Sequence, residues 1–187
     1  TLDGLAHVPM ASIDHDVPIM TFDGLSKAFV SPGLRIGWGI LSGHAEALGA
    51  YRAAIAQLLR ARLSASHPVQ FPIAPALGDQ SHLPALLAKL TARRDVTVTM
   101  LNAIPGISCV APRGAFYAFP KIEIDAAEEE RCIQGLIRET GVVVVHGGGF
   151  GQRPGSAHFR VVYLPPEDTL RRAYGLIGQY FEAWRRR

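Results

Sequence analysis

Two cations stand at the ends of two apolar runs in the stretch "TFDGLSKAFVSPGLRIGW". Lys27 lies in a Gly/Ser turn after the run 17–22, and Arg35 lies where the run 34–41 begins. A lysine in such a turn is most often a solvated loop residue. The chemical alternative is a Schiff base with a carbonyl cofactor, for which the amine, with a reference pKa of about 10.4, must lose its proton. Because a guanidinium matches phosphate oxygens, the pair would supply two contacts that pyridoxal phosphate requires.

Arg160 is the second candidate, in the segment "HFRVVYL". Strand alternation puts Phe159, Val161 and Tyr163 on one face and Arg160 on the other, among apolar neighbours. A salt bridge on an edge strand is the commoner explanation for such an arginine. The alternative is an anion site, in which the guanidinium binds a substrate carboxylate through two hydrogen bonds.

Three glycines follow His146 at the end of the run 142–145. An oxyanion-hole loop of the lipase type would need a G-x-S-x-G motif later in the chain, and none follows residue 149. The glycines therefore predict a tight loop in which the backbone closely approaches a ligand or another strand. The seven histidines show no metal-ligand spacing, so no metal site is expected.

Composition limits the remaining classes of function. The 187 residues carry a net charge of +3 and 48% hydrophobic residues, which is typical of a globular protein. Arg185, Arg186 and Arg187 are expected to complement the dipole of a terminal helix rather than bind nucleic acid. No apolar run has the length of a membrane span, and no leader pattern opens the chain. Two distant cysteines suit a reducing compartment, so we expect a cytoplasmic protein. From the charge pattern and the short apolar runs we expect no nucleic-acid or membrane partner.

The elements that would position these residues follow from hydrophobic periodicity. Strands are predicted over 17–22 and 34–41, followed by a helix over 44–63 that must stop before the prolines of 66–75. A long helix over 83–101 leads to short strands at 108–110, 115–122, 142–145 and 158–164. Helices are predicted over 126–139 and after Pro166. This order predicts part of an α/β domain joined by the long helix to an α+β unit.

Four segments, taken in order, resemble a known family. "TFDGLSKAFVSPGLRIGW", "PRGAFYAFPKI", "GVVVVHGGGFG" and "HFRVVYLPP" are similar to the C-terminal half of class I/II aminotransferases of PLP fold type I, and most similar to the bacterial alanine aminotransferase group. The resemblance implies an α/β fold in which residues 1–80 form the C-terminal part of the large domain. Residues 81–187 would then be the linking helix and the small α+β domain. It also implies pyridoxal 5'-phosphate as the cofactor and a homodimer.

The same resemblance implies roles for individual residues. Lys27 matches the lysine that forms the internal aldimine and moves the proton of the substrate Cα. Arg35 matches the arginine that binds the cofactor phosphate, and Arg160 matches the arginine that binds the substrate α-carboxylate. Gly114 and Phe116 match a mobile stretch of the small domain near the substrate.

The chain departs from the family at one cofactor contact. Many members have a hydroxyl residue three positions before the lysine, where this chain has Gly24. Ser26 stands directly before the lysine, and whether it substitutes is left open. The family's aspartate at the pyridine nitrogen would lie upstream of residue 1, so we expect the isolated chain to be inactive or nearly so.

The implied reaction is transfer of an amino group between an amino acid such as alanine or glutamate and a 2-oxo acid. Two alternatives remain open at this point. Another fold type I enzyme, such as a β-eliminating lyase, would use the same lysine and arginines. An aminotransferase-like sensor domain of a transcription regulator would retain the fold for ligand binding alone.

Overall fold

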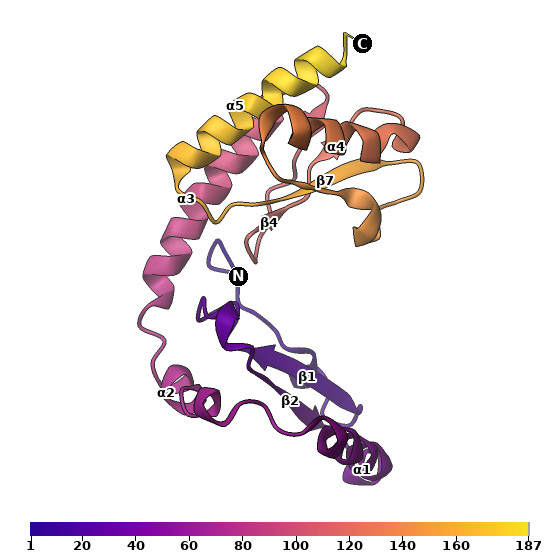
Figure 1. Cartoon of the computed structure of the whole chain (residues 1–187). Helices are drawn as coiled ribbons and strands as arrows, with labels where there is room; N and C mark the ends of the chain where they lie inside the picture. The colour runs from indigo at the N-terminus through magenta and orange to yellow at the C-terminus, as the bar shows by residue number, and fades with distance from the viewer. Residues whose placement is uncertain (187) are drawn as a thin grey trace. The chain divides into compact units, whose positions relative to one another are not determined.

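The computed structural model describes residues 1–186, so Arg187 of the predicted arginine cluster lies outside the described residues. The chain forms two compact units, each described here by itself (Figure 1). The first unit is Ala6–Pro84, and the second unit combines residues 1–5 with residues 85 onward. No helix of the described residues is long and apolar enough to cross a membrane.

The first unit is built on a two-stranded antiparallel sheet. Strand β1 (Ile19–Gly24) pairs with β2 (Gly37–Ser42), with Gly24 opposite Gly37 at the end of the ladder. The two predicted strands are therefore confirmed, each starting two or three residues later than the sequence suggested. Short 3₁₀ turns occur at Met10–Ser12, Pro32–Leu34 and His67–Gln70, and the helices are α1 (Ala45–Arg62) and α2 (Ile73–Gly78).

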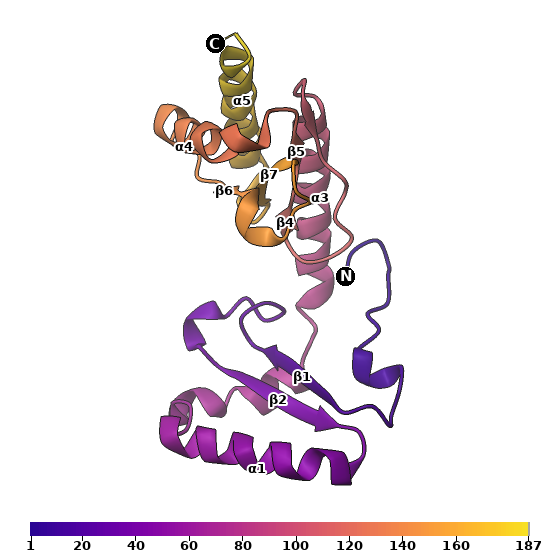
Figure 2. The same cartoon turned by 90° about the vertical axis from the view of Figure 1, so that its right-hand side faces the viewer.

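The second unit packs three long helices with short antiparallel strands (Figure 2). The helices are α3 (Leu83–Asn102), α4 (Glu129–Thr140) and α5 (Glu167–Trp184), and 3₁₀ turns occur at Ala126–Glu128 and Gly147–Phe150. The strands are β3 (Ile107–Ser108), β4 (Tyr117–Ala118), β5 (Lys121–Ile122), β6 (Val145–His146) and β7 (Ala157–Val162). Their order is β3-β5-β7-β4, and β6 also pairs with β7.

Two predicted strands are shorter than the sequence suggested. The run 115–122 is divided into β4 and β5 around Pro120, which lacks the N–H that a ladder needs, although both strands pair with β7 in one continuous register. In the run 142–145 only Val145 is in a strand, while Val143 is 79% exposed.

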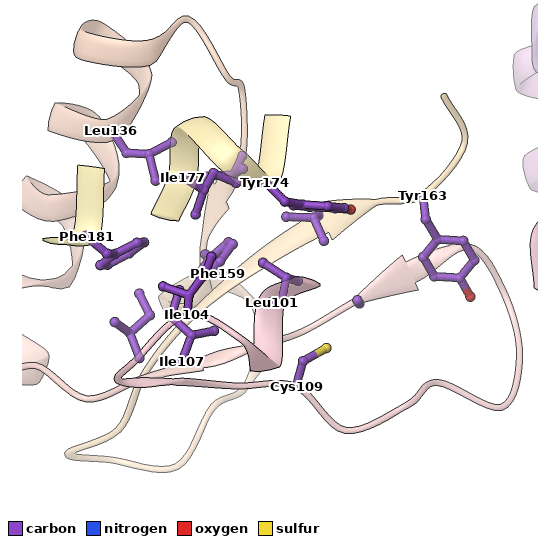
Figure 3. Close-up of a cluster of buried hydrophobic side chains, with 14 of the residues drawn as sticks. Leu101, Ile104, Ile107, Cys109, Leu136, Phe159, Tyr163, Tyr174, Ile177 and Phe181 are labelled. Atoms are coloured by element: carbon purple, nitrogen blue, oxygen red, sulfur yellow. The ribbon is translucent and has the colours of Figure 1, made fainter. Parts of the chain in front are cut away.

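The core of the second unit gathers side chains from all three helices and from β7 (Figure 3). The last helix contributes Leu170, Tyr174, Ile177 and Phe181, all of which are buried. A buried hydrogen bond of 2.9 Å between the Thr97 and Tyr174 hydroxyls joins α3 to α5. This core supports β7, the strand that carries Arg160.

The first five residues dock on the second unit, whereas the domain prediction grouped them with residues 6–80. Leu2 is buried and donates its N–H to the Arg113 carbonyl at 2.9 Å. The Asp3 carboxylate lies 2.6 Å from the Arg94 guanidinium on α3. These contacts cross more than ninety positions of the sequence, so local patterns could not reveal them.

Candidate functional site

Three of the predicted cofactor residues line one hollow of the first unit, with a volume of about 450 Å³. Lys27 and Arg35 are exposed and Ser26 is half-buried. The hollow lies where the end of β1 faces the start of β2. Because these two strands are paired, Lys27 and Arg35 line the same hollow although they are eight positions apart. It is lined by Phe22, Asp23, Gly24, Ser26, Lys27, Arg35, Ile36 and Gly37.

Backbone hydrogen bonds close the loop that holds these side chains. Leu25 N–H donates to the Ile36 carbonyl at 3.4 Å, and Ser31 N–H donates to the Leu25 carbonyl at 3.2 Å. Leu25 and Ile36 are buried, so they anchor the two ends of the loop. Arg35 has a φ of +52°, a conformation that costs free energy for a residue with a Cβ and that concentrates at functional sites. Its guanidinium donates to the Pro32 carbonyl at 2.7 Å.

Gly24 departs from the family pattern for a steric reason. A Cβ at this position would lie 2.7 Å from the Ile36 carbonyl oxygen and 3.1 Å from the Gly37 Cα. Both atoms belong to the backbone and cannot swing aside, so no hydroxyl side chain fits here without parting the strands. Ser26 brings a hydroxyl to the hollow two residues later.

Arg160 lies between two aromatic rings in the second unit. Its guanidinium carbon is 4.1 Å from the centroid of the Phe150 ring and 4.8 Å from that of Tyr117. Both distances are within the range of cation–π attraction. Alternation along β7 is confirmed, because Phe159 and Val161 are buried while Arg160 is only half-buried.

The edge-strand salt bridge that the sequence suggested for Arg160 is wrong. Strand β7 pairs with β6 at Arg160, and Phe159 donates its N–H to the Pro120 carbonyl on the opposite side. Successive residues of a strand point their N–H groups in opposite directions, so β7 has partners on both edges. Among residues 1–186, no Asp or Glu side chain forms an ion pair with Arg160.

Gly114 and Phe116 lie on the segment that leads into β4. Tyr163 fixes this segment, since its hydroxyl donates to the Ala115 carbonyl at 3.1 Å and its N–H donates to the Phe116 carbonyl at 3.1 Å. The Phe116 ring lies 4.7 Å from the Tyr117 ring, which in turn faces Arg160. Gly114 and Phe116 thus belong to the same unit as Arg160, whereas Ser26, Lys27 and Arg35 belong to the other.

Glu129 is a residue that the sequence analysis missed. It opens α4, its side chain is only 5% exposed, and its carboxylate accepts hydrogen bonds from Gly148 N–H, Gln152 Nε2 and His158 N–H at 2.9, 2.7 and 2.9 Å. Burial by itself raises the pKa of Glu129, but these hydrogen bonds lower it below its ordinary value. A usable signal was present: positions 129, 132, 133 and 136 share one helical face, and all four residues are buried.

The glycine loop behaves as the sequence predicted, with its backbone against a neighbouring strand. A Cβ on Gly147 would lie 2.9 Å from the His158 carbonyl oxygen and 2.3 Å from Gln152 Oε1. Only glycine therefore fits between β7 and the Gln152 side chain. Among residues 1–186, no group of three or more His, Cys, Asp or Glu residues could hold a metal ion.

Comparison with known proteins identifies the family. Residues 3–177 match the sequence family Aminotransferase class I and II. The chain belongs to this family. It is 35% identical to the alanine aminotransferase of Mycobacterium tuberculosis over 98% of its own length and 44% of that protein. It is 30% identical to the glutamate-pyruvate aminotransferase AlaA of Escherichia coli, over 97% and 46% of the two lengths.

Solved structures agree with the family assignment. An alanine aminotransferase from Pyrococcus furiosus matches with a TM-score of 0.87 and 37% identity, over 95% of this chain and 45% of that one. An aminotransferase from Escherichia coli matches with a TM-score of 0.88 and 31% identity, over 97% and 46%. The predicted α/β fold of PLP fold type I is thus confirmed. The chain spans about half the length of the curated relatives it matches.

Proposed function

We propose that the whole protein carrying this chain is a pyridoxal phosphate-dependent aminotransferase that exchanges an amino group between an alanine- or glutamate-like amino acid and a 2-oxo acid. The observation that carries the proposal is the hollow lined by Ser26, Lys27 and Arg35. Relatives named alanine aminotransferase and glutamate-pyruvate aminotransferase support this choice of substrates. They favour amino transfer over the β-elimination and sensor alternatives.

The residues of the hollow suit the cofactor in size and chemistry. A volume of about 450 Å³ lies in the ordinary range for small-molecule sites. In the proposal Arg35 and the Ser26 hydroxyl hold the phosphate, because a guanidinium and a hydroxyl are both donors to phosphate oxygens. Lys27 Nζ reaches the aldehyde end.

Pyridoxal phosphate, when bound, supplies a carbonyl carbon for amine exchange and a conjugated ring that accepts electron density from the substrate Cα. Lys27 would act as the acid and base, its Nζ moving the proton of the substrate Cα to the former aldehyde carbon of the cofactor, and in the opposite direction when the 2-oxo acid is converted. Arg160 binds the α-carboxylate of the substrate, and Gly114 and Phe116 border the same region. Contact with the ring faces is compatible with a carboxylate at the guanidinium, because cation–π attraction depends on the charge of the group and needs no particular N–H.

A homodimer and a cytoplasmic location complete the proposal. The location rests on the two distant cysteines and the dimer on the family resemblance. The dimer is tested by the mass of the whole protein in light scattering. A monomer at micromolar concentration would remove that part of the proposal and leave the chemistry untouched.

The chemical proposal is tested by trapping with borohydride. The lysines of this chain are Lys27, Lys89 and Lys121, so peptide mass distinguishes a label on Lys27 from a label on either of the other two. With pyridoxal phosphate and borohydride, the whole protein should be modified at Lys27, and Lys27→Arg should abolish this while Lys89→Arg should not. The wild-type protein should also convert alanine and 2-oxoglutarate to pyruvate and glutamate. Equal labelling of all three lysines, or absence of turnover, contradicts the proposal.

A further inference from the structure

Glu129 ties down both ends of the loop that joins β6 to β7. Its Oε1 accepts from the Gly148 N–H at the start of the loop, and its Oε2 accepts from the His158 N–H at the end. The Gln152 side chain, in the middle, donates to the same Oε2 at 2.7 Å. One buried carboxylate on α4 thus fixes three points over eleven residues of loop and strand.

Two structural features lead from these fixed points to Arg160. Phe150, whose ring lies 4.1 Å from the Arg160 guanidinium carbon, is midway between Gly148 and Gln152, so Glu129 holds the residues two positions before and after it. His158 precedes Arg160 by two positions on β7 and therefore lies on the same face of the strand. The carboxylate accordingly fixes the ring above the guanidinium and also the strand beneath it.

A second series of contacts connects Gln152 to the face of β7 that carries His158 and Arg160. Gln152 Oε1 lies 3.1 Å from His158 Nδ1, and the His158 ring stacks on Phe119 with 4.8 Å between centroids. Phe119 in turn lies edge-on to Phe150 at 6.0 Å. Phe150 is therefore connected through Phe119 and His158 to the hydrogen bonds of Gln152. Among the described residues, Glu129 is the only one whose carboxylate accepts a hydrogen bond from Gln152 or His158.

We infer that Glu129 is a positioning residue for Arg160. It holds the Gly147–Phe150 turn so that the Phe150 ring stays in contact with the guanidinium, and this contact keeps the guanidinium in one orientation towards a substrate carboxylate. The inference rests on the proposed function, in which Arg160 binds that carboxylate. Glu129 itself touches neither substrate nor cofactor in this proposal. Its loss should therefore weaken substrate binding and leave the chemical step and cofactor binding intact.

The test compares Glu129→Gln with Glu130→Gln in the whole protein. Glu130 is the neighbouring residue in the first turn of α4 but is exposed, so it controls for the loss of one negative charge at the helix start. Glutamine keeps the shape of Glu129 but turns an amide towards N–H donors that need an acceptor. For Glu129→Gln we expect KM for alanine and for the 2-oxo acid to rise about tenfold, with kcat and pyridoxal phosphate affinity within about twofold of wild type. Glu130→Gln should match wild type in all three.

Hydrogen exchange supplies a readout that does not depend on activity. The Gly148 and His158 amides should exchange faster in Glu129→Gln than in wild type or Glu130→Gln, while amides of α5 should not change. If Glu129→Gln does not fold, Gln152→Ala removes one donor and Phe150→Ala removes the ring, and both should raise KM about threefold to tenfold at constant kcat.

The outcomes separate the two proposals. Faster exchange in the loop with unchanged KM would refute the positioning role while leaving the proposed function intact. A fall in kcat or in pyridoxal phosphate affinity equal to the rise in KM would also refute it, because that pattern reports general loss of structure. Absence of turnover in the wild-type protein would refute the proposed function, and the role of Glu129 in it as well.

Discussion

Restoring the family's hydroxyl residue at position 24 should damage this protein. On the resemblance alone, Gly24→Ser would add a donor to the cofactor phosphate and strengthen binding. The structure predicts the opposite, because the new Cβ would be 2.7 Å from the Ile36 carbonyl oxygen. That distance is shorter than real Cβ contacts allow, and the atom in the way is backbone, so β1 and β2 must separate at the pair Gly24–Gly37.

The magnitude follows from the cost of overpacking. Forcing extra atoms into a packed site costs about 1–3 kcal/mol, whereas replacing a glycine by a larger residue at an unstrained site gains about 0.4–1 kcal/mol through the unfolded chain. Gly33 provides the matched control: it lies in the same loop, and a Cβ there would meet nothing within 4 Å. Both variants gain the unfolded-chain term, which cancels in their difference, so Gly24→Ser should be less stable than Gly33→Ser by the overpacking cost of about 1–3 kcal/mol.

The assay must follow the first unit alone, because two units need not unfold together. The chain has two tryptophans, and Trp38 lies on β2 opposite Asp23, next to the altered pair. In a Trp184→Phe background, its fluorescence reports urea unfolding of this sheet. Pyridoxal phosphate titration should show weaker binding to Gly24→Ser than to Gly33→Ser. Equal urea midpoints and slopes, or tighter cofactor binding by Gly24→Ser, would refute the steric reasoning.

Two further predictions concern buried ionisable groups of the second unit. The hydrogen bonds to Glu129 lower its pKa below the ordinary value of 4.5, so they stabilise the folded state at pH values above 4.5. This stabilisation is lost as the pH falls through the pKa that Glu129 has in the folded protein. Trp184 fluorescence in urea should therefore show wild type losing its advantage over Glu129→Gln as the pH is lowered below 4.5, and a constant difference would contradict this. Burial raises the pKa of the Cys109 thiol to about 11, and Cys132 is fully buried. Iodoacetamide at pH 8 should label both at least about 100-fold faster in urea than in the native protein, and rapid native labelling would show that the core opens.

The sequence was sufficient to place Lys27 and Arg35 at the ends of two strands because the determinants of those positions are local. Lys27 and Arg35 each follow or precede an apolar run, and a two-stranded antiparallel sheet necessarily brings those two ends together. The alternation around Arg160 was equally local. The sequence did not predict that Arg160 stands between two rings, because Tyr117 and Phe150 reach it from segments 43 and 10 positions away.

Glu129 was missed for a related reason. Three successive glutamates, Glu128, Glu129 and Glu130, stand at the start of α4, where any of them is a favourable charge at the positive end of the helix. The structure separates them by direction, since Glu129 is buried and Glu130 is exposed. In the sequence, only the helical face that Glu129 shares with Cys132 distinguishes it from the other two glutamates. That periodicity predicts a buried side chain but does not predict which N–H groups bond to it.

Arg94 and Arg160 show how the structure separates a structural arginine from one available to a ligand. Arg94 is 7% exposed, and its guanidinium is used by Asp3, Asp95 and the Pro112 carbonyl, at 2.6, 2.8 and 3.4 Å. Those hydrogen bonds raise its pKa, although burial opposes them, and little capacity is left for an anion. The Arg160 guanidinium carbon lies instead over the Tyr117 and Phe150 rings, and among residues 1–186 no carboxylate forms an ion pair with it. An arginine held in this way is pre-organised for a carboxylate at little entropic cost, which is the arrangement that the proposed substrate binding requires.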